Sequence, residues 1–591
     1  MKPKLIVGAA IGDCVHVAGV VNFLNLAEQL GYHTICLGPA VGVDELLDRV
    51  AELDPAVVAV GYRLTPENCR SLLGELAAKA VVRGEGGRSW LFGGTEPCVA
   101  IAEETGLFQK AFASGASKQA VVAYLRGEQT AAAPGAPPPQ TLAERIRWKA
   151  PYPLIRHHFG RPNVPETVAG VAEIAQAGSL DVLSLGTDQN AQEHFFRPAE
   201  MDPNAHGAGG VPVRTPDDLA QIYAHTRLGN YPIMRCYSGT RDTLRWAPML
   251  AETIHNAWCA IPLFWYTQLD GRSLRPLRES IPETQALMRW HAEHGIAVEM
   301  NESHHWSLRD APDVVAVVAA FLAAYNARSC GVRDYVQQLM FNNPPSTSPI
   351  MDLGKMLAKL ELVEGLQNET FHVWRETRGG LTSYPPDPSV ARGHLAATVA
   401  LQMQLKPHIV HIVGHTEAHH ATTAAELIEA CAITDGVISQ CLLGLPDMTL
   451  DPRVQERKAA LLADARVLLD AIASLTAPGR DPYTDPDTLA TAVEIGLLDA
   501  PHLRGNAAGC GKIVTRIVNG ACQAVTPSGE VIPETKRVAE ILATKAERAA
   551  THALIAASKA RPAPAAGAPQ KVTGSAAAAF NPPAAVGGGR S

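Results

Sequence analysis

A histidine that could bind a metal follows the first apolar run of the chain. The run from Leu5 to Ile11 leads into Gly12-Asp13-Cys14-Val15-His16 and then into a helical pattern that contains Gly19. Neutral imidazole is a good ligand for a transition metal, and a nearby carboxylate can hold its other nitrogen and fix the tautomer. Gly19 leaves room for a bulky group beside the helix start. We therefore expect His16 to be a metal ligand, with Asp13 as its hydrogen-bonded partner.

Two glycines could leave space for a ligand, and a set of histidines could bind a metal. Gly93-Gly94 directly follows the apolar run Trp90–Phe92, and residues without side chains there leave space beside a strand. Histidines gather at His408, His411, His415, His419 and His420, and at His304–His305. Imidazoles four residues apart on a helix can share a zinc ion, but no carboxylate or cysteine completes a recognisable ligand set. Histidines that line a cleft or are satisfied in the core are the favoured interpretation.

The first 127 residues must position His16 and the glycine pair. They alternate short apolar runs with helical patterns, and a five-stranded parallel sheet with helices on both faces is expected. The expected strands are Leu5–Ala10, Thr34–Leu37, Val57–Tyr62, Trp90–Phe92 and Gln109–Ala113. This pattern is typical of a flavodoxin-like, doubly wound domain, whose ligands bind beyond the carboxyl ends of the strands. His16 and Gly93 fall at that edge.

A second α/β series follows a segment that contains AAAPGAPPP. Its expected strands are Leu180–Leu185, Pro232–Arg235, Ala260–Tyr266, Ile296–Met300, Glu369–Trp374 and Ile409–Val413. So many strand–helix units in one stretch favour a (β/α)₈ TIM barrel, with functional side chains just past the strands. The predicted organisation is thus an α/β chain with four parts: a first domain at 1–128, a Pro/Ala-rich linker at 129–150, a barrel with a C-terminal extension at 151–545, and a tail at 546–591 that is largely disordered from about 561.

Composition excludes several classes of protein. A formal charge of −8 over 591 residues gives no sign of nucleic-acid or membrane binding. The eleven cysteines form no CxxC pair, which argues against an iron–sulfur cluster, a zinc ribbon or a disulfide framework. The apolar stretch Val314–Ala324 falls well short of the roughly 20 residues that a membrane span needs. These features predict a cytoplasmic protein with reduced thiols, which binds neither nucleic acid nor membranes.

The first domain resembles the cobalamin-binding domain shared by methionine synthase and the carbon-skeleton mutases. That family carries Asp-x-His-x-x-Gly after strand one, Ser-x-Leu after strand three and Gly-Gly after strand four. The resemblance implies a base-off cobalamin (vitamin B12) with His16 on the lower face of cobalt. The remaining cofactor-binding positions that it implies are Asp13, Gly19, Gly61, Gly93, Gly94 and Gly115. Two positions depart from the pattern: Asp13 and His16 are one residue further apart, and Gly61-Tyr62-Arg63 replaces Ser-x-Leu.

The second domain resembles the large subunit of glutamate mutase (methylaspartate mutase) in short collinear segments. These include Phe371-His372-Val373-Trp374 and His415-Thr416-Glu417-Ala418. The resemblance implies that Arg235 grips a substrate carboxylate, that Glu302 lies near the substrate and that Glu417 contacts the ribose of an adenosyl group. Asp270, in the stretch from Pro262 to Arg272, completes the expected catalytic set.

Two departures from the mutase pattern concern the substrate. Gln192 stands where the family has a second substrate-binding arginine, and Leu263 stands where it has a glutamate that meets the substrate's amino group. A leucine cannot accept a hydrogen bond from an ammonium, and a buried unpaired charge is costly. We therefore expect a small carboxylate-bearing substrate that is not glutamate.

The function implied by both resemblances is that of an adenosylcobalamin-dependent radical isomerase, a carbon-skeleton mutase. Two alternatives remain open at this point: a corrinoid methyltransferase that uses methylcobalamin, and a non-catalytic cobalamin-binding protein. A homodimer formed through the barrel domain is also expected.

Overall fold

The computed structural model describes residues 4–116, 118–127 and 137–559. The chain divides into two compact units. One holds the residues up to Cys259 together with Arg375–Gly379 and Tyr384–Leu445, and the other holds Ala260–Trp374, Gly380–Ser383 and the residues from Pro446 onward. The tail expected from about 561 and residues 129–136 of the expected linker lie outside the described residues. None of the described helices is long and apolar enough to cross a membrane.

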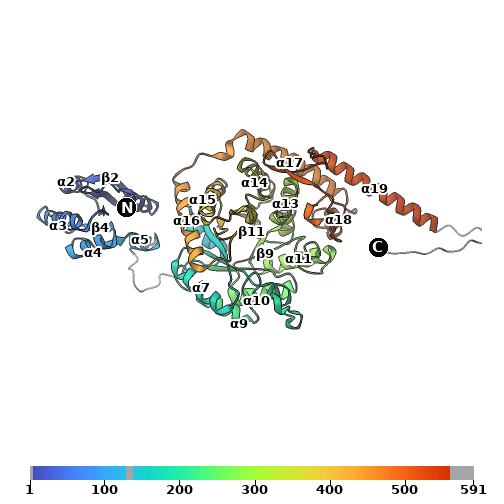
Figure 1. The fold of residues 1–591 in the computed structure, drawn as a ribbon, viewed down its shortest axis with the longest axis horizontal. Helices are drawn as coiled ribbons and strands as arrows, with labels where there is room; N and C mark the ends of the chain where they lie inside the picture. Colours follow the sequence, from blue (N-terminus) through green and yellow to red (C-terminus); the bar gives the residue numbers. More distant parts are fainter. Residues whose placement is uncertain (1–3, 117, 128–136, 560–591) are drawn as a thin grey trace, which may run out of the picture. The chain divides into compact units, whose positions relative to one another are not determined.

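The N-terminal region folds as the expected five-stranded parallel sheet, in the order β2-β1-β3-β4-β5. Its strands are β1 (Leu5–Ile11), β2 (His33–Val41), β3 (Val57–Tyr62), β4 (Ser89–Gly94) and β5 (Lys110–Ala113). Its helices are α1 (Ala18–Gln29), α2 (Val43–Leu53), α3 (Pro66–Val82), α4 (Glu96–Thr105) and α5 (Lys118–Leu125). Helix α1 contacts α5, while α3 contacts both α2 and α4, so the helices form two layers (Figure 1, blue).

Each face of this sheet has its own apolar core, because the central strands are buried on both sides. On the α1 side, Val20 and Leu24 pack against the sheet, and two strand glycines allow the close approach. A Cβ atom on Gly61 would lie 2.5 Å from Val20 Cγ2, and one on Gly8 would lie 2.8 Å from Val20 Cγ1. The side chains of α1 therefore occupy the volume that larger strand residues would need.

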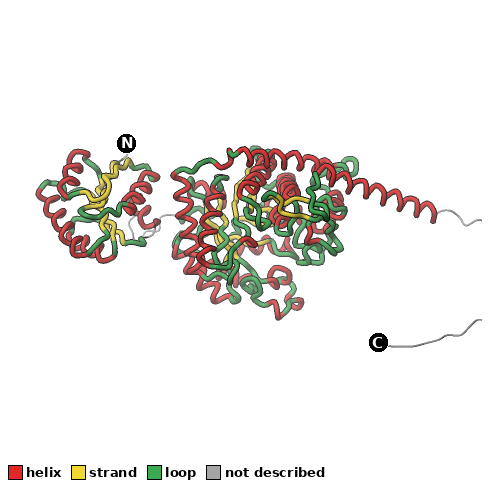
Figure 2. Tube along the Cα trace, turned by 45° about the horizontal axis from the view of Figure 1, so that its top comes forward, coloured by secondary structure: helices red, strands yellow, loops and turns green. Residues whose placement is uncertain are grey.

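The second region contains a closed eight-stranded barrel in the order β6-β7-β8-β9-β10-β11-β12-β13. Figure 2 shows its strands in yellow among red helices. Its strands are β6 (Leu154–Phe159), β7 (Val182–Leu185), β8 (Ile233–Tyr237), β9 (Trp258–Ile261), β10 (Ala297–Met300), β11 (Asp334–Met340), β12 (His372–Arg378) and β13 (Ile409–His411). The expected barrel architecture is thus confirmed.

Several strand predictions were wrong in detail. Strands β6 and β11 were not predicted, because polar side chains interrupt their apolar runs. The run expected as strand Ala260–Tyr266 is a loop after Ile261, and the strand expected to end at Trp374 runs on to Arg378. Arg235, expected at a strand end, is the middle residue of β8.

Helices connect the barrel strands and extend beyond them. Those of the barrel are α6 (Leu142–Lys149), α7 (Val164–Ala177), α8 (Gln189–His194), α9 (Pro216–His225), α10 (Thr243–Ile254), α11 (Leu277–Glu293), α12 (Glu302–Ser307), α13 (Asp313–Ser329), α14 (Pro349–Glu364), α15 (Pro388–Met403) and α16 (Ala424–Leu443). Beyond them come α17 (Pro452–Ala473), α18 (Pro486–Glu494), the hairpin β14 (Thr515–Val518) and β15 (Ala521–Ala524), and α19 (Glu534–Lys559).

The segments expected as linker and tail are partly helical. Helix α6 falls inside the expected linker, and its Arg145 is buried and donates to the carbonyl oxygens of Asn230 and Tyr231. Helix α19 continues to Lys559, inside the expected tail. Composition alone did not show these helices, because α6 is short and α19 is rich in alanine and charged residues.

Candidate functional site

A hollow opens at the carboxyl edge of the N-terminal sheet and continues between helix α1 and strands β3–β5. The residues of this domain that line it include His16, Gly19, Val20, Phe23 and the strand-end segments 59–63, 91–94 and 112–116. His16 is exposed, on the loop between β1 and α1. The sheet therefore brings the predicted ligand His16 and all the predicted glycines to one surface, because parallel strands end at the same edge.

The glycines of this hollow divide into two groups. A Cβ atom on Gly94 would lie 2.4 Å from the carbonyl oxygen of Tyr62, and Gly61 is similarly blocked by Val20, so both are required by the fold itself. Gly19 and Gly93 have no atom within 4 Å of such a Cβ. Gly115 is also open but has a φ of +104°, which favours glycine. Only Gly19 and Gly93 are therefore left unexplained by backbone geometry and packing.

Asp13 has a different partner from the one expected. Its Oδ1 atom accepts a hydrogen bond from the hydroxyl of Tyr62, at 3.1 Å, and no bond between Asp13 and His16 is found in the described residues. Burial, followed by the hydrogen bond and the negative charge of Asp13, raises the pKa of Tyr62. Tyr62 therefore stays protonated and fixes the loop that leads to His16. The sequence showed Tyr62 as a departure from the family but not what it contacts.

His16 could hold a metal only together with ligands from elsewhere. In the described part of the chain, no group of three or more histidine, cysteine, aspartate or glutamate residues is arranged to hold a metal ion. A site with one protein ligand suits a metal that brings its other ligands with it. Its open surroundings and the continuous hollow suit a ligand much larger than an ion.

In the barrel, charged side chains occupy the interior between β6 and β12. Arg156 on β6 is fully buried and donates to both carboxylate oxygens of Glu376 on β12, at 2.5 and 2.6 Å, and to Ser184 on β7. Both bonds to Glu376 come from Nη1 of Arg156, and this ion pair neutralises both charges where water is excluded. The barrel interior thus contains polar side chains, and the pattern of apolar residues in the sequence did not predict it.

Arg235 lies deep in this interior. It is completely buried, and its guanidinium lies 4.7 Å from the ring centre of Tyr237 and 5.8 Å from that of Trp258. Tyr237 ends β8, and its hydroxyl lies 3.2 Å from His158 Nε2. Burial, aided by the nearby arginines, lowers the pKa of His158 well below its usual range, so the imidazole is neutral.

A residue that sequence reasoning missed lies at the end of β12. Arg378 is 7% exposed and interacts electrostatically with Tyr237, Arg156 and Glu417. The exposed Glu417, expected near an adenosyl ribose, is therefore placed beside Arg378. The signal for Arg378 was present in the sequence, since an arginine precedes Gly379-Gly380, but the strand was expected to end four residues earlier.

Glu302 has both carboxylate oxygens occupied. Its Oε2 accepts from the backbone amides of Leu263 and Phe264, at 2.7 and 3.1 Å, and its Oε1 accepts from Trp306 Nε1 at 2.9 Å. Burial raises the pKa of Glu302 to about 7, against these three donors. Glu302 therefore fixes the loop after β9, and Leu263 meets it through a backbone amide while its own side chain is buried.

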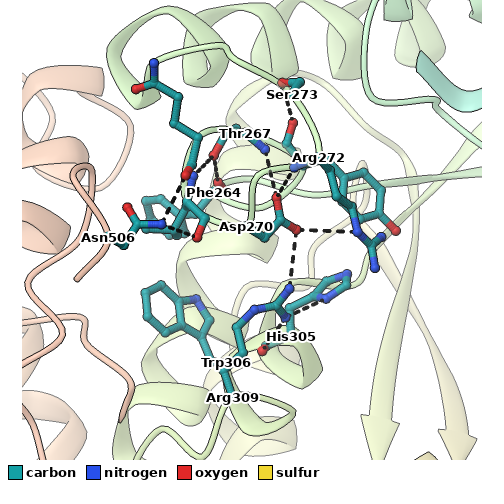
Figure 3. A network of polar contacts seen from close by, with 12 residues as sticks. Phe264, Thr267, Asp270, Arg272, Ser273, His305, Trp306, Arg309 and Asn506 are labelled. Atoms are coloured by element: carbon teal, nitrogen blue, oxygen red, sulfur yellow. Dashed lines mark hydrogen bonds and ion pairs between the residues drawn. The ribbon is translucent and has the colours of Figure 1, made fainter. Parts of the chain in front are cut away.

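Asp270 holds two arginines beside the same loop, as Figure 3 shows. Its Oδ2 lies 3.3 Å from Arg309 Nη2 and 3.7 Å from Arg272 Nε. Arg309 lies over the ring of Trp265 at 3.9 Å, and Arg272 lies over that of Tyr266 at 4.7 Å. These contacts identify Asp270 as the centre of a network that shapes the aromatic loop.

The other residues singled out in the sequence are scattered. Gln192 donates to the carbonyl oxygen of Thr187 at 2.8 Å. His411 is buried in β13, His415 lies near Glu429, and His420 bonds Glu426 at helix α16. His419 and His420 contact each other, with 2.8 Å between their Nδ1 atoms, but the described residues of this cluster form no group that could hold a metal ion.

Comparison with known proteins shows no family. No family model matches the chain, and no curated protein matches it. A solved cobalamin-binding protein from Desulfitobacterium hafniense DCB-2 is 22% identical over 21% of this chain and 59% of its own length, with a TM-score of 0.19. The cobalamin-dependent S-adenosylmethionine radical enzyme OxsB is 8% identical over 84% of this chain and 72% of its own, with a TM-score of 0.17. At these TM-scores, neither likeness shows a shared fold.

Proposed function

We propose that this chain is a cobalamin-dependent isomerase, with cobalamin in the N-terminal domain and an anionic substrate in the barrel. The observation that carries the proposal is the hollow that joins the exposed imidazole of His16 to the open space beside Gly19 and Gly93. A lone histidine beside a long hollow suits a cobalt ion carried in a corrin ring. The resemblance of this region to cobalamin-binding domains agrees with that chemistry.

Within this proposal, His16 would hold the cobalt ion of the cofactor. The Tyr62–Asp13 bond holds the loop that carries His16, and the hollow beside α1 takes the nucleotide tail. Adenosylcobalamin, when bound, supplies a carbon-centred radical that starts rearrangement of a carbon skeleton. The barrel's part is to bind and orient the substrate and to exclude water.

Three features of the barrel support a small carboxylate-bearing substrate other than glutamate. The barrel strands carry three buried arginines, Arg156, Arg235 and Arg378. The buried carboxylate of Glu376 lies near Arg156 and Arg378. Leu263 offers no acceptor for an ammonium group. The carboxylate of Glu302 is occupied by three donors, so it too is committed to the protein. Arg235, whose guanidinium lies against the ring of Tyr237, remains a proposed substrate contact.

The test uses the full chain loaded with adenosylcobalamin. We expect base-off binding and formation of cob(II)alamin, detected by EPR, when the correct carboxylic acid is added from a panel that includes glutamate and 3-methylaspartate. Methyl transfer from methylcobalamin, without any such signal, would favour the corrinoid methyltransferase. Tight cobalamin binding with neither reaction would favour a carrier, and rapid interconversion of glutamate and 3-methylaspartate would contradict the exclusion of glutamate.

A further inference from the structure

We propose that Arg378 binds a carboxylate group of a ligand at the mouth of the barrel, together with His411. This inference deepens the proposed function, on which it rests for the idea that the ligand is the substrate. It moves the main anion contact from Arg235, in the middle of β8, to a strand end.

Arg378 has the right position for such a contact. It is the last residue of β12, and its backbone pairs in register with His411, the last residue of β13. The carboxyl ends of the strands form the ligand-binding face of barrels of this kind. Gly379 and Gly380 follow at once, so no bulky side chain comes directly after the guanidinium in the chain.

The guanidinium of Arg378 lacks the hydrogen bonds that burial demands. Within the described residues it donates none, and its Nε atom is buried. His411, 1% exposed, likewise has a buried Nε2 atom with no hydrogen-bond partner in that part of the chain. Buried donors without acceptors are costly, and native proteins supply an acceptor for nearly all of them. Both groups therefore call for an acceptor that the described protein does not provide.

The charges around Arg378 indicate that this acceptor is an anion. Arg156 Nη1 donates to both carboxylate oxygens of Glu376, and His411 Nδ1 lies 3.3 Å from Glu376 Oε1, so this buried carboxylate is already engaged. Burial, with a smaller contribution from Arg156, lowers the pKa of Arg378. Glu417 is the other nearby acid; burial raises its pKa, and within the described residues its carboxyl group accepts no hydrogen bond from Arg378. A carboxylate on the ligand would balance the positive charge and accept two parallel bonds from the planar guanidinium.

Tyr237 and His158 border the same region. The imidazole ring of His158 lies 4.9 Å from that of His411, and its Nε2 atom lies 3.2 Å from the hydroxyl of Tyr237. Burial lowers the pKa values of both histidines well below the usual range, so neither adds positive charge. His411 Nδ1 lies 3.3 Å from Glu376 Oε1. In the tautomer with its single proton on Nε2, a neutral His411 donates one hydrogen bond to the ligand, while Arg378 supplies the charge.

The experiment measures binding of succinate, a dicarboxylate without an amino group, to the full chain by isothermal titration calorimetry. We expect saturable binding with one site per chain, weakened about tenfold or more in both Arg378→Gln and Arg378→Lys, because lysine keeps the charge but loses the planar fork. The matched control is Arg392→Gln, which removes an arginine paired with Glu429 on helices α15 and α16. That variant should bind succinate like the wild type.

Three results would overturn the assignment: no saturable succinate binding, equal affinity in the wild type and the folded Arg378 variants, or tighter binding of inorganic phosphate than of succinate. Circular dichroism checks folding, and Arg378→Lys serves if Arg378→Gln does not fold. The proposed function is tested separately with His16→Ala, which should lose cobalamin affinity and still bind succinate. Loss of succinate binding with intact cobalamin binding in Arg378→Gln supports both ideas independently.

Discussion

The hydroxyl of Tyr62, at the end of β3, donates a hydrogen bond to the carboxylate of Asp13, with 3.1 Å between Oη and Oδ1. The bond joins two strand ends and fixes the loop from which His16 projects. In the sequence, Asp13 was expected to bond His16 directly. The carboxylate instead acts on the position of the loop, and its influence on the imidazole is indirect.

The Tyr62–Asp13 bond predicts equal and non-additive effects of two substitutions. Tyr62→Phe and Asp13→Asn should each weaken cobalamin binding by about tenfold or less, and the double variant should be no weaker than either single variant. Tyr32→Phe is the control, since the hydroxyl of Tyr32 bonds Leu125 elsewhere in the same domain. Spectroscopic titration measures the affinities. Additive losses would show that the two residues act separately.

The role of His16 predicts a spectroscopic change that activity alone could not reveal. In His16→Ala, cobalamin binding should weaken, and the cob(II)alamin EPR spectrum should lose the hyperfine splitting from a histidine nitrogen. His33→Ala, which removes another exposed histidine of the domain, should keep both. Unchanged splitting in His16→Ala would mean that another group occupies the lower face of cobalt.

The two groups of glycines predict opposite outcomes for the same kind of change. Gly93→Val should leave stability nearly unchanged and weaken cobalamin binding, because the new side chain enters the open hollow. Gly61→Ala should destabilise the apo protein by about 1–3 kcal/mol, because its Cβ meets Val20. Thermal melting and cobalamin titration of both variants distinguish the two effects. A stable Gly93→Val variant with normal cobalamin affinity would contradict the proposed position of the ligand.

Glu302 predicts a pH dependence of folding stability. Its pKa is about 7 when folded and about 4.5 when unfolded, so the folded state binds the proton more tightly. The stability that this group contributes is complete below pH 4.5 and is lost as the pH rises to 7. The loss of stability is about 3 kcal/mol at most, because each unit of difference between the two pKa values corresponds to about 1.4 kcal/mol.

Chemical denaturation at several pH values measures that contribution. Glu302→Gln should remove this part of the pH dependence. Its amide keeps one acceptor oxygen and loses the other, so either Trp306 Nε1 or the amides of Leu263 and Phe264 lose their partner, and stability falls at every pH. Glu293→Gln, at an exposed position of α11, should leave the curve unchanged. Parallel curves for the wild type and Glu302→Gln between pH 4.5 and 7 would show that Glu302 ionises normally.

The sequence predicted the first domain better than the barrel, for a physical reason. Its strands are buried on both faces, so each reads as a continuous apolar run, and the position of His16 follows from the end of the first run. In the barrel, inward positions of β6 and β11 carry Arg156, His158 and Gln337, and these break the pattern that reveals a strand.

The candidate site shows the same limit. The glycines could be found in the sequence, but whether each leaves open space depends on Val20 and Tyr62, which lie far away in the chain. Arg378 was missed because the sequence pattern placed the end of β12 at Trp374. With the strand end four residues too early, Arg378 was not among the residues expected at the carboxyl ends of the strands. The partners of Glu302 and Asp270 depend on loop conformations that no periodicity encodes.

The Arg156–Glu376 pair also has a consequence for how the chain is made. The two residues are 220 positions apart, so a ribosome adding about 5–20 residues per second completes Glu376 about 10–45 seconds after Arg156. During that interval Arg156 lacks its carboxylate partner, and β6 has no β13 beside it. The emerging barrel therefore cannot close while the N-terminal domain, already complete, can fold. Newly made chains pass through a state with one finished domain and an open, charged half-barrel, the form that a chaperone would meet.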